Sequence, residues 1–230
     1  MRKIIKFFLM MALMTPTLSV AQSATNSVYI DQVGDSSTIT LTQSGQNNSI
    51  GTENARFQIQ GGNQNITVLQ NGTENSIQGS IKQADNVNYS INMIGDSNTL
   101  DIDHGSAGSV SGSALTLNAT GSVNTFTLTQ GDAASSSGAV QTINLTGDRN
   151  TYTSKINADD VIQTTTVTGD SNTLDLLQNG RAAKNLDFTL TGSNNNFTVK
   201  QTSTLNVDRL SINSQSSGTT MLIKQCNSGC

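Results

Sequence analysis

The residues that could catalyse a reaction are few in this sequence. His104 is the only histidine among 230 residues, so a Ser/His/Asp or Cys/His set could be built around this position alone. We interpret it instead as a stand-in for a buried amide. Asp101 with Asp103, and Asp159 with Asp160, are paired carboxylates of the kind a glycosidase uses. We interpret both pairs as surface charge, and we expect no enzymatic activity, no metal site and no cofactor.

Two cysteines stand near the end of the sequence, as Cys226-Asn-Ser-Gly-Cys230. In an exported protein, cysteines this close favour a local disulfide, which would pin the last turn of the chain. Pairing between molecules and a metal site are the alternatives. Zinc fits poorly, because only two thiols and no neighbouring histidine are present.

Carboxamides near glycines are the polar groups with a regular spacing. The tetrapeptide Gly-x-x-Asn occurs nine times, and from Gly72 onward its intervals are 23, 26, 26, 22 and 23 residues. Glycine adopts a positive φ without steric cost, which suits a tight corner. We predict corners at eight of these glycines and at the near match Gly34-Asp-Ser-Ser: Gly34, Gly45, Gly62, Gly72, Gly95, Gly121, Gly147, Gly169 and Gly192.

The residues after each glycine follow the two-residue period of a β-strand. One side of the predicted strand carries Asn172, Leu174, Leu176 and Gln178. The same parity holds in 124–130 and in 195–201. Each strand therefore turns two apolar side chains inward, between an inward Asn and an inward Gln.

These inward amides need partners, because an unpaired polar group is costly to bury. If each carboxamide stacks on its counterpart in the next turn, it donates to one neighbour and accepts from the other. We predict such structural amide ladders from Asn26, Gln32, Gln43, Asn48, Asn54, Gln60, Gln70, Asn75, Asn98, Asn124, Gln130, Asn150, Asn172, Gln178, Asn195 and Gln201.

A second alternation of apolar and polar residues precedes each corner, as in 89–93 and 115–119. One turn, called a rung here, is therefore a strand, a glycine corner, a second strand and a return loop. The sequence predicts an all-β fold, a parallel two-sheet β-solenoid with eight or nine rungs of 22–26 residues. Loops such as 105–113 and 132–138 lengthen two rungs. A single rung buries too little apolar surface to fold alone, so stability comes from stacking.

The first segment, 1–21, has the three parts of a Sec signal peptide: basic residues, an apolar run and a small-residue cleavage site. We expect cleavage before Gln22, a repeat domain over 22–225 and a cysteine-containing tail over 226–230. Loss of three basic residues with the signal takes the formal charge from −4 to −7. The acidic balance and the lack of a basic patch argue against nucleic acid as a partner.

The pattern resembles the curlin repeat. Each half of that repeat has Asn or Ser, then five residues and then Gln, and a glycine corner joins the two halves. Asn26-x5-Gln32, Ser37-x5-Gln43 and Asn54-x5-Gln60 match it, and the resemblance extends over most of residues 26–201. It implies a secreted subunit that passes an outer-membrane pore, joins other curlin-like subunits and forms extracellular curli amyloid that supports adhesion and biofilm.

The sequence also departs from that pattern. His104 and Ile156 stand at Gln positions, and four apolar residues replace Gln before later corners: Ala119, Leu145, Val167 and Leu190. The resemblance therefore fits a nucleating or accessory subunit as well as a major one.

The alternative function is a monomeric solenoid that acts through one outer face, as an adhesin or an ice-binding protein. The outward triplets Thr38, Thr40, Thr42 and Thr125, Thr127, Thr129 resemble the threonine arrays of ice-binding solenoids. A regular array needs Thr in every rung, and charged residues interrupt the equivalent places: Asp101, Asp103, Asp175 and Lys200. We therefore expect no uniform face and prefer the fibre.

Overall fold

The computed structural model describes residues 26–52, 57–82, 85–95, 97–105, 111–121, 123–131, 136–147, 149–169, 171–180, 183–192, 194–202, 208–215 and 218–226. The predicted signal segment 1–21 lies outside these residues. Every regular element in the described part of the chain is a β-strand. A search of the same residues finds no helix with the length and apolar character to cross a membrane.

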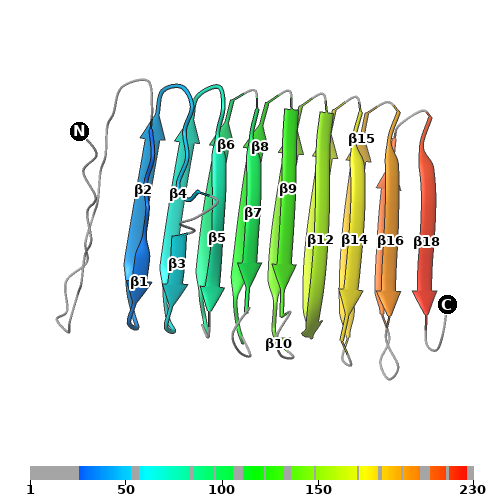
Figure 1. Ribbon diagram of the computed structural model, residues 1–230. Helices are drawn as coiled ribbons and strands as arrows, with labels where there is room; N and C mark the ends of the chain where they lie inside the picture. Colours follow the sequence, from blue (N-terminus) through cyan, green and yellow to red (C-terminus); the bar gives the residue numbers. More distant parts are fainter. Residues whose placement is uncertain are drawn as a thin grey trace.

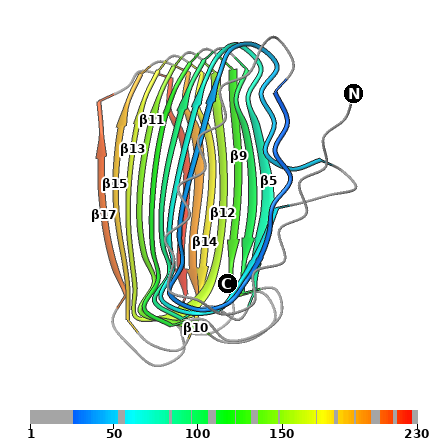
Figure 2. The same cartoon turned by 90° about the vertical axis from the view of Figure 1, so that its left-hand side faces the viewer.

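The strands form two parallel sheets that face each other (Figures 1 and 2). Sheet A contains β1 (Asp31–Val33), β3 (Phe57–Gln60), β5 (Ser76–Lys82), β7 (Thr99–His104), β9 (Val123–Gln130), β12 (Arg149–Asp159), β14 (Thr173–Asn179), β16 (Asn196–Thr202) and β18 (Thr220–Cys226), with β10 (Ser136–Ser137) beside β12. Sheet B contains β2 (Thr38–Ser44), β4 (Asn65–Asn71), β6 (Asn88–Ile94), β8 (Ala114–Thr120), β11 (Val140–Thr146), β13 (Val161–Thr168), β15 (Lys184–Thr191) and β17 (Arg209–Ser214).

Apart from short β10, successive strands alternate between the sheets, so each rung contributes one strand to each layer. Figure 1 shows the rungs side by side, with the first and the last at opposite ends. The order β1-β3-β5-β7-β9-β12-β14-β16-β18 faces the order β2-β4-β6-β8-β11-β13-β15-β17. The predicted parallel two-sheet β-solenoid is confirmed.

The core is a flat layer between the sheets, built from columns of equivalent residues in successive rungs. One sheet A column contains Ile77, Leu100, Phe126, Tyr152, Leu174 and Phe197, each at most 2% exposed. Gly79 is the gap in the neighbouring column, and the ring of Phe57 lies over it, since a Cβ on Gly79 would overlap that ring. Burial thus follows the two-residue period predicted from the sequence.

The corner that leads from sheet B to sheet A, called the glycine corner here, has a constant length. Ile94 and Thr120 pair across the rungs, and so do Thr99 and Thr125, five residues further along. The glycines of this corner have φ between 122° and 158°: Gly45, Gly72, Gly95, Gly121, Gly147, Gly169 and Gly192. A Cβ on Gly72 would overlap the carbonyl oxygen of Gly45, and the same contact recurs up to Gly192. Only glycine adopts such a φ readily and also has no Cβ to overlap the carbonyl oxygen of the neighbouring rung.

The opposite corner, called the return corner here, leads from sheet A to sheet B. Gly34 lies there and not at the glycine corner, and Gly61 stacks on it with φ of 125°. The prediction of a corner with positive φ at Gly62 is therefore wrong by one residue. Because β3 turns Phe57 and Ile59 inward, the strand ends on outward Gln60 and the chain turns at Gly61. β7 ends at His104 and β8 begins at Ala114, and β9 ends at Gln130 and β11 begins at Val140, so the two lengthened rungs have their extra residues between a strand of sheet A and the next strand of sheet B.

Candidate functional site: buried amide ladders and end rungs

A ladder of asparagines follows the glycine corner along sheet A. The Nδ2 atom of Asn75 donates to Oδ1 of Asn48, Asn98 donates to Asn75, and Asn124 donates to Asn98. Asn150 continues the column and is 1% exposed, yet neither of its amide atoms has a hydrogen-bond partner in the described part of the chain. The ladder therefore stops after four members.

A shorter asparagine ladder resumes beyond the break. The Nδ2 atom of Asn195 donates to Oδ1 of Asn172 at 2.9 Å. The predicted column of inward asparagines is present from Asn48 to Asn195, but its hydrogen bonds form two separate runs.

The glutamine ladder of sheet B is confined to the first rungs. Gln70 donates to Oε1 of Gln43 at 2.7 Å, and Gln43 donates to the carbonyl oxygen of Ser49 at 2.6 Å. The same column then becomes apolar, through Met93, Ala119, Leu145, Val167 and Leu190. All five are buried, so the apolar replacements seen in the sequence do end this ladder.

The glutamine column of sheet A contains the substitutions that the sequence indicated. His104 pairs with Gln130, Ile156 lies between Gln130 and Gln178, and Gln201 follows. Gln201 donates to Oε1 of Gln178 at 2.9 Å.

Two buried glutamines of sheet B, which the sequence pattern does not single out, pair with the amides on either side of Ile156. Gln141 donates across the core to Gln130 at 2.7 Å, and Gln178 donates to Gln163 at 2.9 Å. Gln163 in turn donates to the hydroxyls of Tyr152 at 3.1 Å and Ser154 at 3.2 Å. Parity could have found Gln141 and Gln163, because each stands two residues before an inward residue of its strand.

The predicted ladder is least accurate in the first rungs. Asn26 is buried, but its amide donates to the carbonyl oxygen of Ser44 and not to another amide. Gln32 is half-buried and donates to Ser37, and its column neighbour is Ile59.

Gln60 faces solvent, which corrects its inward assignment. Gln64 is fully buried in its place and donates to the carbonyl oxygens of Gly34 and Gln60. Asn54 lies outside the described residues. Phe57 and Ile59 explain the error, because their burial reverses the parity that Asn54-x5-Gln60 predicts.

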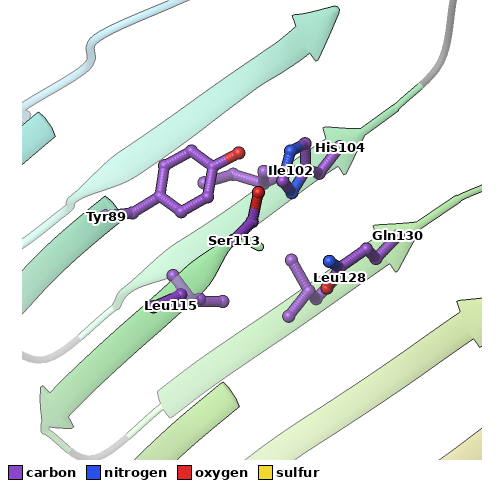
Figure 3. Close-up of a pocket in the computed structure, with 8 residues that line it drawn as sticks. Tyr89, Ile102, His104, Ser113, Leu115, Leu128 and Gln130 are labelled. Atoms are coloured by element: carbon purple, nitrogen blue, oxygen red, sulfur yellow. The ribbon is translucent and has the colours of Figure 1, made fainter. Parts of the chain in front are cut away.

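A small pocket lies next to His104 (Figure 3). The rings of Tyr89 and His104 meet edge to face, with centroids 5.1 Å apart and an interplanar angle of 81°. The hydroxyls of Tyr89 and Ser113 are buried with no hydrogen-bond partner among the described residues. Burial raises the pKa of Tyr89 well above its usual value. The pocket is enclosed by core side chains and holds no paired acid and base.

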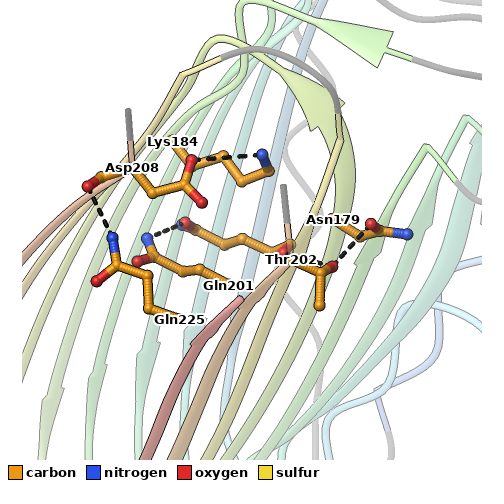
Figure 4. Close-up of polar contacts among 7 residues, drawn as sticks. Asn179, Lys184, Gln201, Thr202, Asp208 and Gln225 are labelled. Atoms are coloured by element: carbon orange, nitrogen blue, oxygen red, sulfur yellow. Dashed lines mark hydrogen bonds and ion pairs between the residues drawn. The ribbon is translucent and has the colours of Figure 1, made fainter. Parts of the chain in front are cut away.

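A buried ion pair lies near the last rungs (Figure 4). The Nζ atom of Lys184 is 3.5 Å from a carboxylate oxygen of Asp208, and both side chains are at most 2% exposed. The backbone carbonyl of Asp208 accepts a hydrogen bond from Gln225 at 2.8 Å. These interactions therefore join β15 to the segment before β17 and to β18.

The C-terminal cysteines are only partly described. Cys226 ends β18, is 7% exposed and is disulfide-bonded. Cys230, its predicted partner, lies outside the described residues. No group of three or more potential metal-ligating side chains occurs within the described ranges.

The two end rungs leave inward positions uncovered. Met221 and Ile223 of β18 are 45% and 39% exposed, although Phe197 and Val199, which precede them in the same columns, are at most 1% exposed. At the other end, Val28 and Ile30 pack on the core and are half-buried.

The threonine triplets that suggested an ice-binding array lie on opposite outer faces. Thr38, Thr40 and Thr42 belong to β2 of sheet B, and Thr125, Thr127 and Thr129 belong to β9 of sheet A. The interrupting charges Asp101, Asp103, Asp175 and Lys200 are all on sheet A. Sheet B has no charge on the outward residues of β2 to β13, but Asp187 of β15 and Arg209 of β17 face outward, so neither face is uniform along all rungs, as expected.

The arrangement stacks buried amides along the solenoid axis, and the part of the chain that is described has no assembled set of catalytic groups. Comparison with known proteins finds no matching family model, no matching curated protein and no matching solved structure.

Proposed function

We propose that this protein is a secreted, curlin-like structural subunit that stacks end to end into extracellular fibres of a biofilm matrix. The observation that carries the proposal is the open rung of β17 and β18. Its inward residues Met221 and Ile223 are exposed, and β18 has a sheet neighbour on one side only within the described chain. An open strand edge next to exposed apolar side chains is a template for another strand.

The first rung has side chains that suit this template. Extending each core column from the last rung of one copy to the first rung of another places apolar residues on apolar residues and an amide on an amide. The pairs are Met221 with Val28, Ile223 with Ile30, Gln225 with Gln32, Leu210 with Ile39 and Ile212 with Leu41. A parallel rung added here would continue both sheets at the same spacing of about 4.8 Å.

Charge favours the same arrangement. Lys224 and Asp31 occupy one outward column of sheet A, and both are exposed. Stacked copies would bring the ammonium group and the carboxylate together at the junction. Such an exposed pair adds little affinity, but it selects the register and disfavours two like ends meeting.

The resemblance of the repeats to curlin repeats and the signal-like segment 1–21 support export through an outer-membrane pore. Incubating the mature chain, residues 22–230, tests the assembly: we expect fibres that bind thioflavin T and give a cross-β reflection near 4.7 Å. A chain that remains monomeric and does not bind the dye at high concentration contradicts the proposal.

A further inference from the structure

The outer face of sheet B is uncharged over six consecutive strands. We define the neutral face as the outward residues of β2, β4, β6, β8, β11 and β13, which are Thr38, Thr40, Thr42, Ser44, Asn65, Thr67, Leu69, Asn71, Asn88, Ser90, Asn92, Ile94, Ala114, Thr116, Asn118, Thr120, Val140, Thr142, Asn144, Thr146, Ile162, Thr164, Thr166 and Thr168. In contrast, the outer face of sheet A has charged residues on β7, β12, β14 and β16. The outward residues of these six strands of sheet B are therefore free of charge.

The neutral face is ordered in rows along the solenoid axis. One row is formed by hydroxyl residues in each of these six strands: Thr40, Thr67, Ser90, Thr116, Thr142 and Thr164. In the next row, Asn118 donates to Asn92 and Asn144 donates to Asn118, both at 2.9 Å. These bonds fix the amides, and β-branching restricts the threonine side chains. Binding at this face therefore costs little side-chain entropy.

We propose that the neutral face is a self-association surface, on which the neutral face of a second copy docks. Hydroxyl and carboxamide groups both donate and accept hydrogen bonds, so a face made of them is complementary to itself. A two-fold axis places the same patch on both partners. The lack of charge removes the repulsion that two acidic chains would otherwise feel.

The size of the face suits such a contact. Six strands at about 4.8 Å and seven residues at about 3.3 Å give roughly 650 Å² per copy. Two copies would bury roughly 1,300 Å², within the range of about 1,200–2,000 Å² for specific interfaces. Ile94, Val140 and Ile162 add apolar surface to it, since they are 48%, 40% and 49% exposed.

The repeat distance selects a second copy over other flat partners. Two solenoids of this chain have the same rung spacing, so every rung of one face meets a rung of the other across the whole contact, as in a steric zipper. Ice and a crystalline polysaccharide each have a lattice of their own. The charged strands β15 and β17, with Asp187 and Arg209 facing outward, mark where the contact ends.

The proposal concerns single solenoids and fibres alike, so it does not depend on end-to-end stacking. Its test compares T116K/T142K on the neutral face with T127K/T153K on sheet A. Each pair occupies adjacent rungs on an outward face. We expect the wild-type chain and T127K/T153K to form face-to-face dimers in sedimentation, or paired filaments in electron micrographs if the chain polymerises. T116K/T142K should give monomers or single filaments, with pairing weakened at least about 100-fold.

A charge-matched mixture tests the face itself. Adding T116E/T142E to T116K/T142K should restore pairing, because opposite charges then meet across the contact. A wild-type chain that shows only monomers and single filaments overturns the proposal, and so does pairing that survives the neutral-face lysines or fails to return in the mixture. Thermal hysteresis in ice that only the neutral-face lysines abolish, in a monomeric protein, would assign the face to ice.

Discussion

The amide ladders can be tested by comparing two asparagines with the same burial and different bonding. Asn98 and Asn150 are both 1% exposed and occupy the same column. Asn98 donates to Asn75 and accepts from Asn124. Asn150 makes neither bond within the described residues. Replacing each by Leu, which is similar in size and apolar, therefore isolates the value of the two bonds.

The magnitude follows from the groups that each change leaves unpaired. N98L strands the Oδ1 atom of Asn75 and the Nδ2 atom of Asn124 in the core, at about 1–3 kcal/mol for each buried group. We expect a loss of about 2–6 kcal/mol in the free energy of unfolding. N150L breaks no bond and removes two unpaired polar atoms, so we expect no loss or a small gain.

Thermal unfolding by circular dichroism measures the difference, at concentrations where sedimentation shows a monomer. In a chain of this size, about 1 kcal/mol corresponds to about 2–4 °C in the melting temperature. N150L should thus melt at least about 4 °C above N98L. Equal melting temperatures would falsify the reasoning, because they would mean that the hydrogen bonds of the ladder add nothing to stability.

Three further outcomes are expected. K224D should slow fibre growth in a thioflavin T assay because two carboxylates would meet at each junction, and both the double variant K224D/D31K and an equimolar mixture of K224D with D31K should recover it, since alternating copies place a carboxylate against an ammonium group at every junction; growth that stays slow in both would contradict the register. Burial raises the pKa of Tyr152 to about 12, so the unfolded chain loses that proton first and the free energy of unfolding should fall between about pH 10 and 12. The melting temperature of Y152F should fall less steeply with pH over this range than that of the wild-type chain, and identical slopes for the two would count against this account. K184M should lower the melting temperature by leaving the Asp208 carboxylate without its cation, and K184M/D208L should regain most of the loss; a double variant as unstable as K184M would refute that reasoning.

The sequence predicts the fold because one physical rule repeats in every rung. Alternation in 172–178 assigns Asn172 and Gln178 to the core, and both are 1% exposed. Spacing alone also predicts the glycine corner, since its length does not change between rungs.

The prediction fails where a rung departs from that spacing. Between Asn48 and Phe57 the chain is longer than the repeat, so the parity carried forward from Asn48 is no longer valid at Gln60. The burial of Phe57 and Ile59 decides the parity of β3, and this is a tertiary effect. The repeat pattern also does not show that both amide atoms of Asn150 lack a hydrogen-bond partner among the described residues.

The cross-core contacts lie beyond what a repeat can predict. Gln141 and Gln163 occupy positions that are apolar in the other rungs, and their partners belong to the opposite sheet. Lys184 likewise occupies an inward position next to Val161, and only the structure shows Asp208 beside it. A search based on repeat identity misses such residues because their pairing is particular to one rung.

The constant glycine corner has a consequence for how this chain can be enlarged. From β4 onward, variation in rung length falls at the return corner, where the loops from His104 to Ala114 and from Gln130 to Val140 are longer than the others. Foreign peptides placed in those loops should leave the stacking of Gly95, Gly121 and Gly147 unchanged. The solenoid is thus a scaffold with one permissive edge, along which cargo could be displayed in a line with one position per rung.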